Sequence, residues 1–390
     1  MLAKRIIYSP YLLIILTIYL LNFYFFFSNG NSWIFNFNIL DKFGDQRLYI
    51  ELSSHLINHN FVPHVYSVGF PLFLIPFLII LKTTNWVIIS FYLVIIYAFV
   101  IMPTIWILIL SLFYSTLKKT KRKFFYFIPF LALIIYELII LKGSKDPLTF
   151  YLFFGLTPYS EPFAILILII LYYILLTQSK KTIPLIFYLL WGVLAAFAVS
   201  IRIVFIILII PILVLGVIFL LKKKIKKTAC LATGLLVGYL PQLLYNYKTY
   251  HKIFYISYNW YWEKTKSQFE PIIKSVYGDN TVISQFSINY LKSNVSKLIK
   301  HYIHFVLFAI FNVVLIIRKR KTFANLSRLD VIFLASNISV ILYIILYLSY
   351  WWSPYVDCID RFLLPLVFFS LVNLSYSIIL LNENPHPKKI

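Results

Sequence analysis

Three carboxylates, Asp41, Asp45 and Glu51, stand within eleven residues just after the first long apolar segment. The stretch that carries them is far more polar than the sequence on either side. A carboxylate accepts a proton from a hydroxyl or an amine when it is held beside the reacting atoms and shielded from water. Asp45 is therefore a candidate catalytic base. The structural alternative is that Asp45 caps the helix that begins ahead of Leu48.

The composition sets the class of protein. Hydrophobic residues make up 61% of the 390 residues, and uncharged runs long enough to cross a bilayer recur along the chain. The runs are continuous rather than alternating, so the spans are expected to be helices. The net charge of +23 is assigned to cytoplasmic loops, and nucleic acid is not an expected partner.

We expect an all-α polytopic membrane protein of about twelve transmembrane helices, with both termini in the cytoplasm. The apolar segments are 6–27, 68–82, 86–117, 124–142, 161–177, 182–221, 228–246, 301–317, 330–349 and 361–381. Two of these exceed one crossing and are each divided into two helices, 86–117 at Pro103 and 182–221 near Arg202. With this division the basic clusters fall in the cytoplasm and most carboxylates fall outside.

Three regions follow from this topology. Residues 1–246 form a transmembrane bundle with a first outer loop, 28–67. Residues 247–300 form an extracytoplasmic cap, and 301–390 form the C-terminal transmembrane helices. Within the first outer loop, apolar residues and histidines recur every three or four positions over 45–59, which predicts a helix that lies along the membrane interface.

Four short motifs occur in order along the chain. They are Gly44-Asp45-x-x-x-Tyr49, Val68-Gly69-Phe70-Pro71-Leu72, Thr157-Pro158-Tyr159-Ser160-Glu161-Pro162 and Asp360-Arg361-Phe362-Leu363-Leu364-Pro365. In this order they resemble the polyprenyl-phosphate-dependent glycosyltransferases of the GT-C fold, which include protein O-mannosyltransferases and aminoarabinose transferases. Many relatives carry Asp-Glu where this chain has Asp45-Gln46, so the second acid is missing.

The resemblance implies a GT-C-like bundle in the cell membrane with an extracytoplasmic active site. It implies that a sugar passes from a polyprenyl-phosphate donor, with inversion, to a glycan, lipid or protein acceptor, with Asp45 as the base. Membrane lipids are the other expected partners. No cofactor is predicted, and the missing second acid leaves the use of a divalent metal open.

Two arginines are candidates for binding the donor phosphate. Arg202 is the one cation within a long apolar stretch, and charges at such depth are costly unless they face a cavity or a partner. The alternatives for Arg202 are an ion pair with Glu137 or Glu161, or snorkelling to the interface. The resemblance places Arg361 near the active site, at the start of the last helix.

Four further residues are candidates for substrate contact: Tyr49, Tyr159, Glu161 and Trp352. Glu161 has the alternative role of an acid in the first turn of a helix, where the dipole favours it. Trp352 has the alternative role of an interfacial aromatic, which is the commoner reason for tryptophan at such a place. His55, His59 and His64 were considered as zinc ligands, but no acidic third ligand lies at suitable spacing, so no metal site is predicted.

Two other functions are weighed against the transferase. A carrier or flippase for lipid-linked saccharide would need charged or broken-helix sites near the membrane midplane, ideally in two symmetric halves. The charges of this chain are peripheral, and no internal repeat is visible. A non-catalytic membrane subunit would use Asp45 only as a helix cap.

Overall fold

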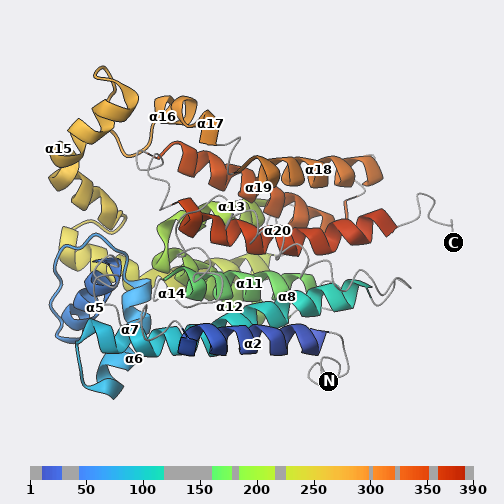
Figure 1. The fold of residues 1–390 in the computed structure, drawn as a ribbon, viewed down its shortest axis with the longest axis horizontal. Helices are drawn as coiled ribbons and strands as arrows, with labels where there is room; N and C mark the ends of the chain where they lie inside the picture. Colours follow the sequence, from blue (N-terminus) through green and yellow to red (C-terminus); the bar gives the residue numbers. More distant parts are fainter. Residues whose placement is uncertain are drawn as a thin grey trace.

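The computed structural model has helical regular structure throughout the part of the chain that it describes (Figure 1). It describes residues 11–28, 44–117, 160–177, 184–215, 225–297, 302–320, 326–350 and 359–382. Within these ranges, strand-like pairing is limited to an isolated antiparallel bridge between Phe286 and Tyr350. The predicted all-α class is therefore confirmed.

Most of the long helices pack against one another along the longest axis of the molecule (Figure 1). They are α2 (Tyr11–Ser28), α8 (Met102–Leu117), α11 (Glu161–Thr177), α12 (Leu185–Ile201), α13 (Ile206–Leu215), α14 (Ile225–Tyr250), α18 (Ile303–Arg320), α19 (Arg328–Leu348) and α20 (Ile359–Asn382). Within the described ranges, three helical runs are long and apolar enough to cross a membrane: Trp86–Phe113, Ile225–Tyr250 and Leu329–Leu348. The chain has the character of an α-helical membrane protein, and the total of twelve spans stays a prediction.

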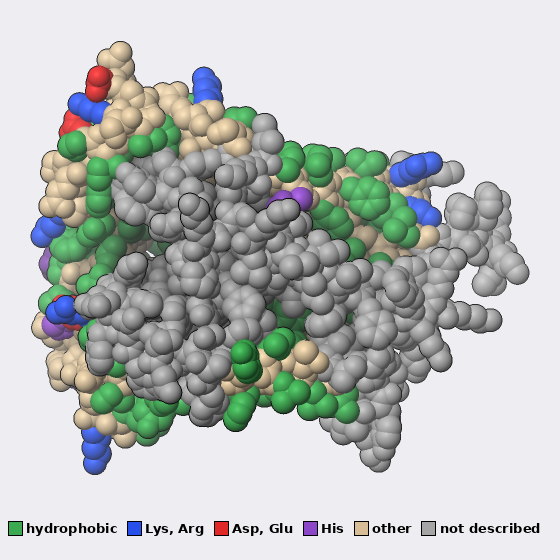
Figure 2. All heavy atoms as spheres, in the orientation of Figure 1, with side chains coloured by type: hydrophobic (Ala, Val, Ile, Leu, Met, Phe, Trp, Pro, Cys, Tyr) green, Lys and Arg blue, Asp and Glu red, His purple; other side chains and the backbone are tan. Residues whose placement is uncertain are grey.

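Apolar side chains cover the flanks of this bundle, and charged side chains gather at its two ends (Figure 2). The last turn of α18 carries Arg318, Lys319 and Arg320, at the end where α2 begins and α20 finishes. The opposite end carries α5 (Gly44–Ile57), α6 (Gly69–Leu81) and α15 (Ser257–Tyr277). We call this opposite end the α5 end. Apolar flanks with charged ends suit helices that stand in lipid and finish in water.

The apolar run 86–117 forms one continuous helical run, and the predicted division into two helices is wrong. The run consists of α7 (Trp86–Ile96), the π-helical turn η1 (Tyr97–Ile101) and α8. Pro103 has no N–H to donate to the carbonyl of Phe99, four residues earlier. That carbonyl instead accepts a hydrogen bond from the Tyr19 hydroxyl of α2 at 3.1 Å. The helix passes the proline because a neighbouring helix pairs the freed carbonyl.

Helix α6 is too short to serve as the span predicted at 68–82. Its 13 residues rise about 20 Å, whereas the hydrocarbon core is about 30 Å thick. The helix packs against α5 and α12 at the α5 end. If 86–117 crosses the membrane once and α6 does not cross it, one crossing takes the place of the three predicted between 68 and 117. An odd number replaces an odd number, so the side predicted for the basic cluster at 118–123 is unchanged.

The predicted break near Arg202 is confirmed. Helix α12 ends at Ile201, and Arg202 has an extended backbone with φ −139° and ψ 106°. The chain then passes through a 3-10 turn, η4 (Ile203–Phe205), into α13. The break interrupts an otherwise apolar stretch at its one charged residue.

Helices α12 and α14 cross at glycines. A methyl group added at Gly234 would lie 2.2 Å from the Leu189 carbonyl oxygen, and one at Gly238 would lie 2.3 Å from that of Val193. Contacts this close leave no room for a side chain, so the two backbones touch directly, as small residues permit in membrane helices. The crossing holds α14 against the helix that ends at Arg202.

The predicted cap is helical. Helix α14 continues to Tyr250, four residues beyond the predicted end of its span. The segment that follows contains α15, α16 (Ile288–Ser293) and α17 (Val295–Lys297). Trp262, Ile273 and Tyr290 form a small buried cluster of their own, against which Tyr350 packs. The cap therefore has a separate core beyond the end of the bundle.

Candidate active site

Three of the predicted site residues, Tyr49, Glu161 and Arg202, lie together at the α5 end. They come from α5, the first turn of α11 and the break after α12. The Arg202 guanidinium forms a hydrogen-bonded ion pair with Glu161. The Ser160 hydroxyl donates to the other Glu161 carboxylate oxygen at 3.3 Å, and the Tyr49 hydroxyl lies 3.3 Å from the Ser160 oxygen. A polar chain therefore connects Tyr49 to Arg202.

The ion pair is largely removed from water. The Glu161 side chain is 2% exposed and the Arg202 side chain is 15% exposed. Each charge makes burial of the other tolerable, since an unpaired ion at this depth is strongly destabilising. The structure thus contains the ion pair with Glu161 that the sequence offered as an alternative for Arg202. Arg202 is the more exposed member of the pair.

Local structure explains the position of Glu161. The Ser160 carbonyl accepts the Ala164 N–H at 3.1 Å, which makes Ser160 the residue that opens α11. Glu161 follows in the first turn, where the positive end of the helix dipole favours a carboxylate. The Glu161 carboxylate therefore both stabilises the start of α11 and pairs with Arg202.

Tyr49 is buried and fixed by aromatic contacts. Its ring centroid lies 4.3 Å from that of Tyr66 and 4.9 Å from that of Phe70. On the same helix, the Ser53 hydroxyl bonds to the Tyr49 carbonyl at 2.7 Å and to the Pro71 carbonyl at 3.0 Å. These contacts join α5 to α6, so the Tyr49 hydroxyl is held at one position relative to Ser160.

The segment between α5 and α6 is fastened to α14. The Val68 N–H donates to the Gln242 side-chain oxygen at 2.8 Å, and the Tyr245 hydroxyl donates to the Val62 carbonyl at 2.6 Å. The Tyr250 hydroxyl donates to the His64 carbonyl at 2.9 Å and accepts its N–H at 3.0 Å. We call Gln242, Tyr245 and Tyr250 the α14 clasp. The clasp holds the backbone that supports Tyr66 and, through it, Tyr49.

The remaining predicted site residues lie partly or wholly outside the described residues. The backbone of Asp45 lies in the first turn of α5, which begins at Gly44, but its side chain is outside the described part. The same holds for Arg361, whose backbone lies in the first turn of α20. Tyr159 and Trp352 are outside it altogether. Their roles stay predictions.

Two side chains that were not predicted belong to the same region. The hydroxyl of Tyr97, the first residue of η1, lies within electrostatic range of Glu161 and Tyr49. The hydroxyl of Tyr343, on α19, is close enough to Arg202 and Glu161 to interact with their charges. Tyrosine is frequent throughout this sequence, so composition gave no signal for either. A π-helical turn often marks a functional position, but no local sequence feature announced one at 97–101.

The histidines do not form the helical pair that was considered for zinc. Helix α5 ends at Ile57, and His59 has a φ of 55°, so His55 and His59 do not share a helical face. Within the described ranges, no group of three or more His, Cys, Asp or Glu side chains is placed to hold a metal. His64 is buried, and its Nδ1 accepts the Tyr66 N–H at 3.3 Å. Burial, followed by the charge of His55, lowers the pKa of His64 to about 4.

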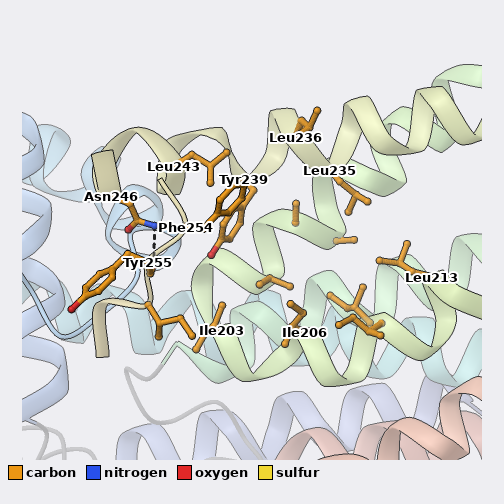
Figure 3. Close-up of a pocket in the computed structure, with 16 residues that line it drawn as sticks. Ile203, Ile206, Leu213, Leu235, Leu236, Tyr239, Leu243, Asn246, Phe254 and Tyr255 are labelled. Carbon is orange, nitrogen blue, oxygen red and sulfur yellow. Dashed lines mark hydrogen bonds between the residues drawn. The ribbon is translucent and has the colours of Figure 1, made fainter. Parts of the chain in front are cut away.

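An apolar groove of about 560 Å³ runs between α14 and the pair α12 and α13 (Figure 3). Tyr239 of α14 lies on one side of it and Ile203 and Ile206 lie on the other. Val199 also lines the groove, so lining residues stand on both sides of Arg202 in the sequence. The size and the apolar lining suit an alkyl or isoprenoid chain.

One end of the groove is closed by a turn after α14. The Asn246 side chain donates to the carbonyls of Ile253 and Tyr255 at 3.0 and 2.9 Å, as Figure 3 shows in part. Phe254, between them, lines the groove and is 85% exposed. The Asn246 amide thus holds the turn that carries Phe254 against α14.

No family model, curated protein or solved structure matches this chain. The chemistry of the site must therefore be argued from its own residues. They place a fixed cation, a buried carboxylate and several hydroxyls at one end of a helical bundle, beside an apolar groove. Such an arrangement suits an amphipathic ligand with an anionic head and a long apolar tail.

Proposed function

We propose that this chain is a membrane glycosyltransferase of the GT-C type that takes a sugar from a polyprenyl-phosphate donor. The acceptor is a glycan, lipid or protein on the extracytoplasmic face of the cell membrane. The observation that carries the proposal is the meeting of Tyr49, Glu161 and Arg202 from three distant stretches. An apolar groove is lined by residues on both sides of Arg202 in the sequence.

The parts of the donor match the parts of the site. The groove takes the apolar chain, and Arg202 takes the phosphate, because a fixed guanidinium binds phosphate oxygens well and stabilises the charge left when the sugar departs. The resemblance adds Arg361 as a second phosphate ligand. Nucleotide sugars are confined to the cytoplasm, so a lipid-borne donor is the form in which an activated sugar reaches the outer face.

The reaction is a single displacement. The acceptor oxygen forms a bond to the anomeric carbon while the bond from that carbon to the phosphate oxygen breaks. The acceptor proton passes to the Asp45 carboxylate, and the electron pair of the broken bond stays on the phosphate, beside Arg202. Attack from the face opposite the phosphate inverts the anomeric configuration.

Replacement of Asp45 by Asn tests the assignment of the base. The change keeps the size of the side chain and an oxygen that caps a helix, but removes a base. We expect the purified Asp45→Asn protein to fold normally and to lose sugar transfer by a factor of about 100 or more. Transfer is measured by mass spectrometry of products formed from polyprenyl-phosphate sugars and a membrane extract.

Glu51→Gln is the matched control. Glu51 lies on the same helix, and its side chain is 53% exposed. This variant makes the same chemical change to a carboxylate that faces water, so transfer should stay at the wild-type rate. Unchanged transfer by Asp45→Asn would remove Asp45 as the base. Loss of folding in that variant alone would favour a structural role for the Asp45 carboxylate.

A further inference from the structure

Two buried polar side chains at the α5 end have no hydrogen-bond partner within the described part of the chain. Gln46 is fully buried, and neither its amide nitrogen nor its amide oxygen is paired. Tyr97 is also fully buried, and its hydroxyl is unpaired. Native proteins pair nearly all their buried polar groups, so unpaired groups at one site call for a ligand or another explanation.

Both side chains border the site described above. Gln46 precedes Tyr49 by three residues on α5, so the two share a helical face. The Tyr97 hydroxyl lies within electrostatic range of Glu161 and Tyr49, and α5 contacts α7, which leads into Tyr97. Tyr97 also opens the π-helical turn, a distortion that often marks a functional position. Gln46 and Tyr97 are therefore each placed relative to Tyr49, one by the helical face and the other by its electrostatic interaction.

The chemistry of the pair differs from that of the rest of the site. An amide offers two donors and an acceptor, and a phenol offers one donor and an acceptor, both without charge. A phosphate is better served by Arg202, and an apolar chain by the groove. Groups that both donate and accept without charge match the hydroxyl groups of a sugar, each of which also donates and accepts.

We propose that the Gln46 amide and the Tyr97 hydroxyl form a subsite for the hydroxyl groups of the sugar that is transferred. This inference rests on the proposed function and names two residues that select its sugar. A site built to pair with a hydroxyl discriminates strongly against a ligand that lacks one, because its own polar groups are then left unpaired.

The test compares a lipid phosphate with and without a sugar. The probes are farnesyl phosphate and its mannosyl, glucosyl, galactosyl and arabinosyl esters, titrated against the purified full chain in detergent. Wild type should bind at least one sugar ester more tightly than farnesyl phosphate. Gln46→Leu and Tyr97→Phe should each raise the Kd for that ester about 5- to 10-fold and leave the Kd for farnesyl phosphate within about twofold.

A second measurement separates a ligand-binding role from a structural one. Each variant replaces an unpaired buried polar group by an apolar group of similar shape, which is neutral or stabilising. We therefore expect the Tm of each free variant to equal or exceed that of wild type while its affinity for the sugar ester falls. A lower Tm with unchanged affinity would show that Gln46 and Tyr97 support the fold, and would overturn the subsite.

Tyr172→Phe is the matched control. Its hydroxyl is likewise buried, with the Ser336 hydroxyl near it but outside ordinary hydrogen-bond geometry, and it lies about 16 Å further along α11 than Glu161. This variant should change neither Kd. The two proposals fail differently: farnesyl phosphate that does not bind removes the donor and the subsite together. Sugar esters that bind no more tightly than farnesyl phosphate, or equally to wild type and variants, remove only the subsite.

Discussion

Arg202, the proposed phosphate ligand, also has a structural role in the ion pair with Glu161. Its pairing with Glu161 makes both buried charges tolerable and at the same time holds the guanidinium still. A fixed cation costs little reorganisation when an anion arrives, which is the property that a phosphate site needs. The structural and the functional explanations of Arg202 therefore do not exclude each other.

A pair of variants separates these two roles. Arg202→Met leaves Glu161 buried without its partner and should lower the free energy of unfolding by about 3 kcal/mol. Arg202→Met combined with Glu161→Gln should recover most of that stability, because no lone charge remains. Neither variant should bind farnesyl phosphate. The measurements are Tm in detergent and the Kd for farnesyl phosphate.

Arg320→Met provides the comparison at the other end of the bundle. Arg320 pairs with the fully buried Asp330 at 2.9 Å, so its loss should also lower Tm, with no change in the Kd for farnesyl phosphate. Recovery of phosphate binding in the combined Arg202 and Glu161 variant would show that Arg202 is a purely structural cation.

His64 gives the fold a dependence on pH. In the unfolded chain His64 binds a proton below a pH of about 6.5, whereas the folded protein holds its pKa at about 4. The unfolded state binds more protons between these values, so the free energy of unfolding falls as pH falls from about 7 to 4, by up to about 3 kcal/mol. His64→Asn keeps an acceptor for the Tyr66 N–H and should remove this part of the pH dependence.

The measurement is the difference in Tm between pH 7.5 and pH 4.5 in detergent. His59→Asn, which changes an exposed residue, should retain the full difference. An equal difference in wild type and His64→Asn would mean that His64 is not kept neutral by the fold.

The sequence indicated candidate site residues where a charged residue stood within or beside an apolar stretch. Arg202 stood out in an apolar stretch, and Glu161 was named among its alternative partners. Gln46 and Tyr97 could not be found in this way, because an amide and a phenol are ordinary residues whose lack of a partner appears only in three dimensions. Tyr49 was found through its motif, and its contact with Ser160 depends on the packing of α5 against other helices.

Proline was a poor guide to helix ends within this bundle. In water a proline in a helix leaves an unpaired carbonyl and often ends the helix. Here the Tyr19 hydroxyl pairs the carbonyl of Phe99, on the far side of Pro103. The period of a single segment contains no information about a partner eighty residues away. By contrast, the break at Arg202 was correctly predicted because a charge as well as a change of residue type marked it.

A double-mutant cycle tests the role of Tyr19. Tyr19→Phe should lower the free energy of unfolding by about 1 kcal/mol, because the Phe99 carbonyl loses the hydrogen bond from the Tyr19 hydroxyl. The same change should cost clearly less in a Pro103→Ala background, since the N–H of residue 103 then reaches that carbonyl. Tyr92→Phe, an exposed position on α7, should have no effect. Equal costs in the two backgrounds would separate Tyr19 from the proline.

At the scale of the molecule, charge was a better guide than helix count. The predicted division of 86–117 into two helices was wrong, yet one crossing in place of three between 68 and 117 gives the same predicted side for the following basic cluster. The distribution of Lys and Arg indicates only on which side of the membrane a loop lies. It therefore fixes whether the number of crossings between two loops is odd or even, and an error of two helices does not change it. The placement of α6 depends on its packing against α5 and α12, which hydropathy does not report.

The corrected path places the turn between α6 and α7 at the α5 end, whereas the sequence placed it in the cytoplasm. In a background without Cys230 and Cys358, we expect a membrane-impermeant maleimide to label Thr84→Cys in intact cells. Lys226→Cys, at the start of α14, should be labelled only after permeabilisation. Labelling of both variants only after permeabilisation would contradict a single crossing by 86–117.

Helix α14 belongs both to the apolar groove and to the support of the segment between α5 and α6, which lie far apart in the sequence. One side of the helix lines the groove. Its last turns form hydrogen bonds, through the α14 clasp, with the segment between α5 and α6 that supports Tyr49. Under the proposed function, a lipid chain that entered the groove would therefore press on the same helix that holds the backbone segment beneath Tyr49.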